Sequence, residues 1–392
     1  MNVIILGSGM MGRAIAYDLE KCSSFSKITI LDKDKNSLSS AKDFLKSNII
    51  DFQIRDVENV QKIEEILRST NVVVSTIPYF YNLELMKLSI KHNAHFIDLG
   101  GNNNVVSKQK NYHKKAVDAN VTIILDNGLA PGLVSVITKD IVDHYENIED
   151  VRIRVGGVPI HPKPPLDYEH VFSLNGLINE YMEDALILDH GEIKPKPSMT
   201  EIELISFPKP FGMMEAFITS GGCSRLPYTF RDKIGYLDYK TIRYPGHCKK
   251  FKAILDLGFG STTPQSIDGF DVVPRDVLIH QLNQVLPKTG EDAVLLKVIS
   301  HAMKNHSQYL IEYTMIDYGD KEKSLTAMMR TTGFPVSITA TFLLDKLIKT
   351  CGVFCPEEII PPLQFFSELE KRNITIEKTE TKTEDKKVEM DE

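Results

Sequence analysis

The sequence predicts an α/β protein with a doubly wound Rossmann sheet, followed by a second α+β domain built on a mixed open sheet. Three observations carry this prediction. A glycine-rich turn follows a short apolar run at the start of the chain, strand-like and helix-like segments alternate to about residue 125, and proline-rich, strand-like sequence takes over after residue 151. Since 392 residues exceed the usual size of one domain, two domains are expected.

The first expected element is a strand that runs into glycines. Residues 3–6 form a continuous apolar run, and Gly7, Gly9 and Gly12 then complete the pattern GxGxxG at the start of a helix that extends to residue 19. The first glycine permits the tight turn, the second lets phosphates approach the backbone, and the third lets helix and strand pack closely. The segment therefore predicts a pyrophosphate cradle at a helix N-terminus.

An acidic residue follows at the distance expected for a ribose contact. Residues 27–31 have the pattern of a second strand, and Asp32 ends it twenty residues after Gly12. A carboxylate there can accept hydrogen bonds from both hydroxyls of the adenosine ribose and would repel a 2′-phosphate. NAD is therefore predicted as the cofactor, and NADP is less favoured. Lys33 and Lys35 moderate that preference, because either could turn toward a phosphate.

Beyond Asp32 the alternation continues through four helices and four strands. Each segment is identified by its apolar periodicity and its flanking turn residues. The expected helices span 37–46, 57–68, 83–92 and 105–119, and the expected strands span 49–54, 71–75, 95–98 and 121–125. Six strands with intervening helices predict a parallel sheet whose ligand lies at the carboxyl ends of the strands.

The residues at those strand ends are the predicted cofactor site. For any one residue after the glycine turn, a role as a helix N-cap or turn residue explains the sequence equally well. The predicted cofactor-binding residues are Gly7, Ser8, Gly9, Met10, Met11, Gly12, Asp32, Asp56, Val57, Thr76, Ile77, Pro78, Asp98, Leu99, Gly100, Asp126, Asn127 and Gly128.

The loop Asp126–Leu133 marks the expected domain boundary, with a proline and glycines ahead of a helix over 133–145. We expect a dinucleotide-binding domain over 1–130 and a substrate-binding and oligomerisation domain over 131–330. Within the second domain, 151–155 is an expected strand, and 247–257 and 274–286 are expected helices. A helix over 325–349 begins a segment, 331–365, that is expected to pack back on the first domain, and 375–392 is expected to be a disordered tail.

Composition excludes several classes of protein. A net charge of −7 argues against a general nucleic-acid binder, and no apolar run approaches the roughly 18 residues needed to span a membrane. Because the first strand begins at Asn2, we expect no signal peptide and a cytoplasmic protein. The five scattered cysteines do not suit a disulfide framework or a zinc site, so free thiols and no metal are expected.

Several longer motifs then occur in a familiar order. They are the Asp98–Gly101 turn, DNGLAPG at 126–132, GGVPIHPKPPLDYEHVFSLNGLINEY at 156–181, EAFITSGG at 215–222, DYKTIRYPGH at 238–247 and RTTGFP at 330–335. With these motifs the chain resembles the saccharopine dehydrogenase-like family to about residue 360, and within it the lysine 6-dehydrogenases. The resemblance implies NAD-dependent oxidative deamination of the ε-amine of L-lysine to a semialdehyde that cyclises, in a homodimer or larger homo-oligomer.

Oxidation of an amino acid at a carbon that bears an amine requires a grip on the carboxylate, which an arginine can provide bidentately. Arg243 is the first candidate, since it lies in a tyrosine-rich stretch beside Tyr244 and ahead of a Pro-Gly pair. Arg225 and Arg330 are the second candidates for substrate binding. Each arginine could instead close a structural ion pair.

The same reaction requires a base, because the amine must be neutral when the hydride leaves. His247 follows a glycine that would let it approach a ligand, although a histidine at the start of a helix is equally often a cap. Tyr168 and Glu215 are the other catalytic candidates, and a carboxylate would suit a cationic amine.

Two alternatives remain open at this stage. Arg225 stands where similar sequences carry a small polar residue, so a second carboxylate could bind there, as a glutamate-forming saccharopine reductase would require. A non-catalytic NAD-binding regulator, whose second domain mediates assembly, is the alternative from another class. The expected ligand in the first two cases is a small amino acid, with no nucleic acid or membrane partner.

Overall fold

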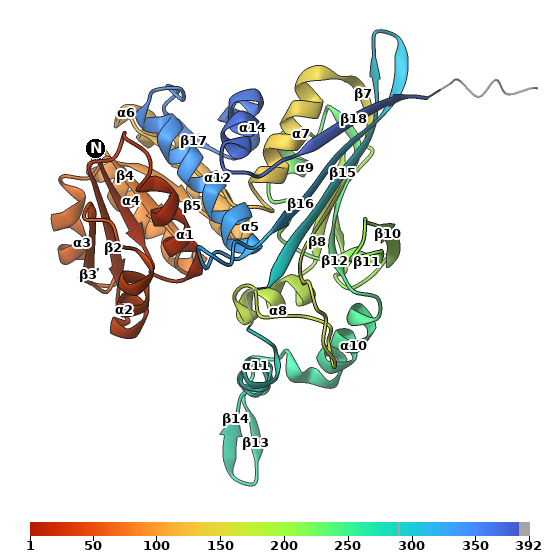
Figure 1. Ribbon diagram of the computed structural model, residues 1–392, viewed down its shortest axis with the longest axis horizontal. Coiled ribbons are helices and arrows are strands. Elements are labelled where there is room, and N and C mark those ends of the chain that lie inside the picture. Colours follow the sequence, from red (N-terminus) through yellow and green to blue (C-terminus); the bar gives the residue numbers. More distant parts are fainter. Residues whose placement is uncertain (289–290, 384–392) are drawn as a thin grey trace, which may run out of the picture.

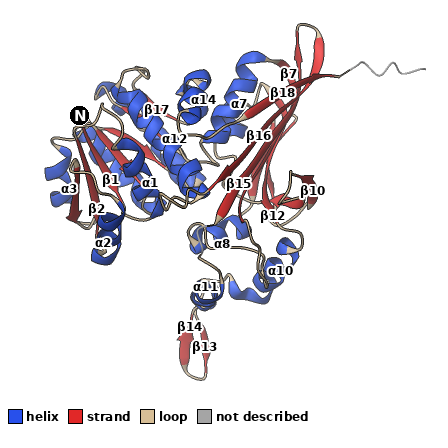
Figure 2. Ribbon diagram, viewed as in Figure 1, coloured by secondary structure: helices blue, strands red, loops and turns tan. Residues whose placement is uncertain are grey.

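The computed structural model describes residues 1–288 and 291–383. These residues form two large sheets, which lie beside one another in the molecule (Figure 1), and one small two-stranded sheet. The first is formed largely by the N-terminal third of the chain, and the second by most of the rest. Figure 2 shows that helices flank the first sheet, whereas the second sheet is built of longer strands. This arrangement confirms the predicted fold class. No helix in these residues has the length and apolar character to cross a membrane.

The first sheet has seven parallel strands in the order β17-β6-β5-β4-β1-β2-β3. Six of them match the strands predicted from sequence. The seventh, β17, returns from the C-terminal part of the chain to pair with β6 and was not predicted. The bounds are β1 Asn2–Leu6, β2 Lys27–Asp32, β3 Ile50–Ile54, β4 Val72–Ser75, β5 His95–Asp98, β6 Thr122–Ile124 and β17 Gly352–Phe354.

Helices cover both faces of this sheet. The predicted helix over 105–119 is broken at Asn111 and Tyr112 into two shorter helices. Alternate residues of β1 point to opposite faces, so Val3 and Ile5 pack with α1 whereas Ile4 and Leu6 pack with α3 and α4. The helices are α1 Met10–Leu19, α2 Lys35–Phe44, α3 Val60–Leu67, the 3₁₀ turn η1 Tyr79–Tyr81, α4 Asn82–Lys91, α5 Asn103–Lys110 and α6 His113–Asp118.

A long helix from the C-terminal part of the chain, α12 (Ala327–Leu344), lies against α1 (Figure 1). Gly333 permits this approach, because a Cβ there would lie 2.8 Å from Cβ of Ala14. Three further helices of this part of the structure are α7 Leu133–His144, α13 Pro356–Ile359 and α14 Pro362–Glu370. Apolar side chains of α7, α12 and α14 therefore belong to one continuous core that includes residues of both sheets.

The second sheet is mixed and has nine strands. Its main path runs β10-β11-β12-β7-β15-β16-β18, with β8 paired to β12 and β9; β12 and β7 are parallel and the other neighbours antiparallel. The strand predicted over 151–155 is the centre of the much longer β7. The bounds are β7 Glu146–Pro159, β8 Ala185–Asp189, β9 Glu192–Lys196, β10 Glu203–Ser206, β11 Met213–Ile218, β12 Ile234–Arg243, β15 Asp292–Lys304, β16 Ser307–Tyr318 and β18 Glu377–Lys382.

The remaining elements lie around the second sheet. The predicted helices over 247–257 and 274–286 are present, the first ending in a π-helical turn, η2. A small hairpin, β13–β14, projects from the body beyond α11 (Figure 1). The bounds are α8 Leu174–Met182, α9 Leu226–Thr229, α10 His247–Ile254, η2 Leu255–Phe259, β13 Gln265–Ile267, β14 Phe270–Val272 and α11 Pro274–Val285.

The expected disordered tail needs one correction. Residues Glu377–Lys382 form β18, an edge strand that pairs with β16. Their six side chains are exposed and mostly charged, which explains why the sequence resembles a solvated segment and is also typical of a protected sheet edge. The rest of the expected tail, residues 384–392, lies outside the described residues.

Candidate functional site

The glycine turn after β1 has the geometry of a phosphate cradle. Gly7 has a φ of +102°, and a Cβ there would lie 2.6 Å from Oγ1 of Thr76. A Cβ on Gly12 would lie 2.0 Å from the carbonyl oxygen of Gly7, whereas nothing lies within 4 Å of a Cβ on Gly9. Gly7 and Gly12 are therefore required by the protein's own packing, while the open, exposed face of Gly9 leaves room for a ligand to approach the backbone.

The N-terminus of α1 points its first amides at this opening. Gly9 is the N-cap and supplies no side-chain hydrogen bond, and half-buried Met10 and Met11 form the first turn. The first amides of a helix have no intrahelical acceptor and carry the positive end of the helix dipole. An anionic group bound here would satisfy them, so the turn fits the pyrophosphate of a dinucleotide.

Asp32, at the carboxyl end of β2, already has partners within the chain. Its Oδ2 accepts hydrogen bonds from the amide of Ser8 at 2.8 Å and from the hydroxyl of Ser8 at 2.7 Å, and its Oδ1 accepts from the amide of Asp34 at 2.9 Å. The carboxylate therefore fixes the turn next to Gly9. Lys33 and Lys35 are exposed beside it.

Several other predicted cofactor residues serve the turns and the core. Thr76 donates from Oγ1 to the carbonyl of Leu6 at 2.8 Å, and exposed Asp56 accepts from the amide of Glu58 at 3.1 Å. Val57 and Ile77 pack against the apolar core on one face of the sheet, and Pro78 precedes η1. These residues lie at or next to the carboxyl ends of β3 and β4, as predicted.

The ends of β5 and β6 are joined by buried carboxylates. Asp98, which is fully buried, accepts from the amides of Gly100 at 2.9 Å and Asp126 at 3.0 Å and from Nε2 of Gln109 at 2.8 Å. A Cβ on Gly100 would lie 1.8 Å from Oδ1 of Asp126, so that position must be glycine. Burial raises the pKa of Asp98, and burial followed by the nearby charges of Asp98 and Glu357 raises the pKa of Asp126 well above its ordinary value.

Asp126 also links the two halves of the chain, because its Oδ2 accepts a hydrogen bond from the hydroxyl of Ser224. Next to it, the side-chain amide of Asn127 is fully buried and has no hydrogen-bond partner among the described residues. Leu99 and Gly128 lie together, since a Cβ on Gly128 would lie 3.5 Å from Leu99 and 3.4 Å from Thr332 of α12.

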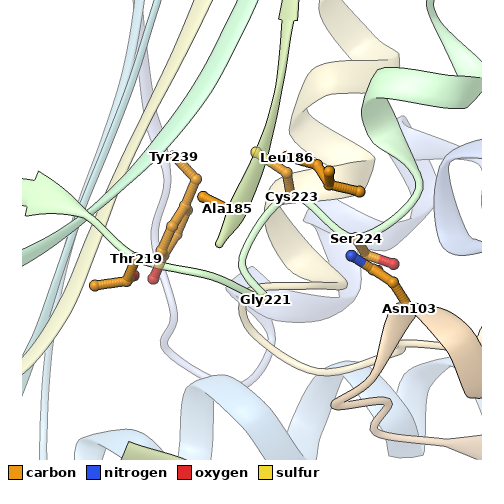
Figure 3. A pocket seen from close by; sticks show the side chains of 8 residues that line it. All are labelled: Asn103, Ala185, Leu186, Thr219, Gly221, Cys223, Ser224 and Tyr239. Atoms are coloured by element: carbon orange, nitrogen blue, oxygen red, sulfur yellow. The ribbon is translucent and has the colours of Figure 1, made fainter. Parts of the chain in front are cut away.

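A small pocket opens where Ser224 meets α5 of the first sheet (Figure 3). Its volume is about 10 Å³, enough for one water molecule. Oγ1 of Thr219 is buried there without a hydrogen-bond partner in the described part of the chain. The lining residues are Asn103, Ala185, Leu186, Thr219, Gly221, Cys223, Ser224 and Tyr239.

From this pocket a row of polar side chains runs along β12. Tyr239, Thr241 and Arg243 alternate on the strand and so share one face of the sheet, which α8 and α10 cover. The guanidinium of Arg243 is 3 % exposed and lies 4.9 Å from the ring centre of Tyr168. Within the described residues, no carboxylate oxygen lies within 4.0 Å of its nitrogens. A buried arginine without a carboxylate is a ready receptor for one.

The predicted base His247 is instead held by a chain of hydrogen bonds. Nε of Arg243 donates to the hydroxyl of Tyr181 at 3.0 Å, this hydroxyl lies 3.1 Å from Nε2 of His247, and Nδ1 of His247 lies 2.8 Å from the carbonyl of Leu166. A carbonyl can only accept, so Nδ1 carries the hydrogen and Nε2 accepts from Tyr181. Burial, then the charge of Arg243, lowers the pKa of His247 to about 3. His247 is therefore a neutral positioning residue.

The other two predicted bases also have structural roles. Glu215 accepts from the amides of Gly246 at 2.8 Å and Cys248 at 2.7 Å, so it caps the N-terminus of α10 and holds His247 in place. Tyr168 is 1 % exposed, and burial raises the pKa of its hydroxyl, which keeps it protonated. Neither side chain reaches the pocket.

Of the remaining substrate candidates, Arg330 needs correction. Its guanidinium makes a two-point ion pair with Asp317 at 2.9 and 3.0 Å and also donates to two backbone carbonyls, so it is a structural group. Tyr244 donates to the carbonyl of Pro159 at 2.9 Å. Arg225 is half-buried, donates to the hydroxyl of Ser107 on α5 at 3.1 Å, and stacks 3.9 Å from the ring centre of Tyr228.

A titratable group that the sequence analysis missed is Glu180 of α8. It lies beside the pocket, since a Cβ on Gly221 would lie 3.9 Å from its Cγ. Burial raises the pKa of Glu180 to about 7, and the charge of Arg243 opposes part of that rise. The signal was present in the sequence only as a lone glutamate in an apolar helix, GLINEY.

Fold and site together are those of a dehydrogenase-type protein, with a glycine turn that fits a dinucleotide beside the first sheet and a buried arginine on the second. Comparison with known families agrees. Residues 3–124 match the saccharopine dehydrogenase NADP binding domain, and residues 128–374 match the saccharopine dehydrogenase C-terminal domain. The chain therefore belongs to the saccharopine dehydrogenase family, which confirms the resemblance predicted from its motifs.

Individual relatives are distant. The chain is 22 % identical to the mitochondrial alpha-aminoadipic semialdehyde synthase of Rattus norvegicus over 92 % of its length, but spans 46 % of that protein. It is 21 % identical to the saccharopine dehydrogenase [NADP(+), L-glutamate-forming] of Saccharomyces cerevisiae, covering 91 % of this chain and 93 % of the yeast protein. The structure of the apo L-Glu-forming yeast enzyme matches with a TM-score of 0.78 and 19 % identity over 97 % of this chain and 99 % of the yeast chain, which establishes the shared fold.

These comparisons correct one prediction. The preference for NAD over NADP, which rested on Asp32, is not supported, because the matching family domain is described as NADP binding and the yeast relative is named for NADP.

Proposed function

We propose that this protein is a nicotinamide-dependent oxidoreductase that oxidises the CH–NH group of an amino acid. The observation that carries the proposal is Arg243, a buried guanidinium without a carboxylate partner among the described residues, on the same strand face as the pocket-lining Tyr239. An amino-acid substrate would supply the missing carboxylate. Membership of the saccharopine dehydrogenase family supports an enzyme of this class.

The proposed reaction needs both a cofactor and groups of the protein. A nicotinamide dinucleotide held at Gly9 and the start of α1 would accept the hydride from the substrate carbon. The chain must hold the carboxylate, keep the amine neutral and take up the proton that the nitrogen loses as the C=N bond forms. Water then adds to the imine, the C–N bond breaks, and the products are a carbonyl compound and an amine.

Glu180 is our proposed general base. It flanks the pocket and has a pKa of about 7, so near neutral pH it can both take and return a proton. The charge of Arg243 lowers the pKa of Glu180, which supports the proposal that base and carboxylate receptor belong to one site. His247 and Tyr181 would act through Arg243 by orienting its guanidinium.

The favoured substrate is a secondary amine of the saccharopine type, with glutamate as a product. The yeast relative is named for forming L-glutamate, which supports this choice. The position of Arg225 adds support, because its guanidinium meets Ser107 where the two halves of the chain join and influences Asp126, so it could receive a second carboxylate.

The second candidate is the primary ε-amine of L-lysine. The observation that favours it is the environment of Arg225, which already has a hydroxyl partner and an aromatic partner. If Arg225 stays engaged, Arg243 is the one receptor left, and lysine has one carboxylate. We also propose NADP as the preferred cofactor, since the carboxylate of Asp32 is occupied by Ser8 and two exposed lysines flank it.

One assay tests the proposal. Formation of reduced nicotinamide is followed with NADP or NAD and with saccharopine or lysine at matched concentrations. Turnover with saccharopine and NADP is expected to exceed that of the other three combinations. Dinucleotide binding with no turnover on any amino acid would contradict the proposal and favour a non-catalytic regulator.

A further inference from the structure

A second cavity lies away from both the glycine turn and Arg243. It has a volume of about 250 Å³ and is enclosed by α7, α14, β16 and the start of β18, which lie together in Figure 1. It shares no lining residue with the small pocket of Figure 3. Since a cavity of about 150 Å³ can hold benzene, this one can hold a ring with a short chain.

One wall of the cavity is a second face of α14. Leu363, Phe366 and Glu370 are spaced three and four residues apart and so share one side of the helix. Phe365 and Leu369, on the other side, are fully buried in the core. The core therefore buries one stripe of α14 fully. On the stripe that lines the cavity, Phe366 packs against the core only in part, and Leu363 and Glu370 are exposed.

The opposite wall carries a buried carboxylate in a fixed position. Asp140 of α7 is 4 % exposed and accepts a hydrogen bond from the hydroxyl of Tyr313. Nδ1 of His144 lies 3.2 Å from Oδ1 of Asp140, and Nζ of Lys378 lies 3.5 Å from its Oδ2. These contacts hold Asp140 in place beside an aromatic ring, so it is a fixed polar group in the cavity lining.

The charges of the lining favour a cation. Its carboxylates are Asp140 and Glu370, and its lysine is Lys378, whose ammonium also pairs with Glu380 at 3.2 Å. No cationic nitrogen lies within 4.0 Å of the Glu370 carboxylate in residues 1–288 and 291–383. The lining holds two carboxylates against one lysine, so an ammonium group is favoured over a second carboxylate.

We propose that this cavity is a binding site for a small organic cation, an amine carried on an apolar ring or short chain. The apolar part lies between Leu363, Phe366 and Ile376, and the ammonium donates to Glu370 at the rim with Asp140 behind it. Phe366 adds an aromatic ring beside which a cation is stabilised, whereas the ring of Tyr313 already has the ammonium of Lys378 at 5.3 Å from its centre. The site is separate from the one proposed for catalysis and does not depend on it.

The test uses the full chain and 2-phenylethylamine, with binding measured by calorimetry. Glu370→Gln is expected to weaken binding about tenfold through loss of the charged acceptor, and Leu363→Ala several-fold through loss of apolar contact. Both side chains are at the surface, so both variants should fold. The matched control is Glu377→Gln, which removes the same charge from exposed β18 outside the cavity lining and is expected to bind as the wild type does.

Two ligands with the same ring but no positive charge test whether the cavity prefers a cation. 2-Phenylethanol and 3-phenylpropanoate keep the ring and are expected to bind at least tenfold more weakly than the amine. Unchanged amine affinity in both Glu370→Gln and Leu363→Ala would overturn the proposal, because the amine would then bind elsewhere. Equal or tighter binding of the carboxylate would overturn it as well.

Discussion

The guanidinium of Arg243 donates a hydrogen bond from Nε to the hydroxyl of Tyr181 at 3.0 Å. Through that hydroxyl the arginine is connected to His247, whose other nitrogen is fixed by the carbonyl of Leu166. One edge of the guanidinium is thereby oriented by uncharged partners, which stabilise its position without neutralising its charge. This is the arrangement expected of a receptor that keeps its charge for a ligand.

Replacing Arg243 by methionine is expected to raise the KM for the amino acid about 10- to 100-fold, because a charge-assisted, bidentate contact is lost. The dissociation constant of the dinucleotide should not change. Steady-state kinetics and dinucleotide titration measure the two quantities separately. Arg330→Met is the control: it breaks the ion pair with Asp317 and should lower the melting temperature without raising KM. An unchanged KM in Arg243→Met would refute carboxylate binding at this residue.

Glu180→Gln is expected to lower kcat about 100-fold or more, since a general base is removed while the shape of the side chain is kept. A base must be deprotonated to act, so kcat/KM of the wild type should rise with pH to a plateau above about pH 7. The variant should lose this rise, which is the acidic limb of the pH profile. Glu183→Gln, on the neighbouring exposed residue, should keep the limb. A limb that persists in Glu180→Gln would show that another group is the base.

Two glycine substitutions separate packing from ligand binding. Gly9→Ala places a methyl group in open space, so the variant should unfold like the wild type but bind the dinucleotide at least tenfold more weakly. Gly12→Ala forces a Cβ to within 2.0 Å of the carbonyl of Gly7 and should destabilise the fold itself. Urea unfolding and dinucleotide titration distinguish the two effects. Normal binding by Gly9→Ala would place the dinucleotide elsewhere.

The buried carboxyl of Glu357 predicts a pH dependence of stability. Burial raises the pKa of Glu357 to about 7 in the folded protein. The folded state therefore binds its proton more tightly than the unfolded state, so stability is highest below about pH 4.5 and falls as pH rises through about 7.

Glu357→Gln should remove this loss. The variant should be more stable than the wild type by on the order of 3 kcal/mol at about pH 8.5, and the difference in stability should vanish toward about pH 4.5. Urea unfolding across this range measures it. Glu358→Gln should have the opposite effect, because Glu358 pairs with Lys110 and accepts from the amide of Cys355. Equal destabilisation by both substitutions would contradict the assignment.

The sequence predicted the first sheet well because its strands are continuous apolar runs separated by helices and turns. It did not predict β17 or β18 for opposite reasons. β17 has three residues, too few to show a period, whereas β18 is polar along its whole length and mostly charged, as is typical of an exposed edge. Both strands exist through pairing with segments far away in the chain, which local sequence does not report.

The site residues that sequence alone assigned wrongly or missed also depend on contacts between distant parts of the chain. The glycine turn and Arg243 are recognisable from residue type and context. The ion pair of Arg330 with Asp317 and the capping of α10 by Glu215 depend on contacts across the second sheet, so these two residues were given functional roles that the structure does not support. Glu180 was missed because its raised pKa depends on how far neighbouring elements cover this half-buried side chain, which local sequence does not report.

The most direct measurement follows a single turnover. The protein, saturated with NADP, is mixed with saccharopine deuterated at the carbon to be oxidised, and the absorbance of the reduced nicotinamide and its deuterium content are recorded. The account predicts rapid formation of one equivalent of reduced cofactor carrying the deuterium, slowed in Glu180→Gln. Absence of reduced cofactor with saccharopine and with lysine, while the dinucleotide is demonstrably bound, would contradict it.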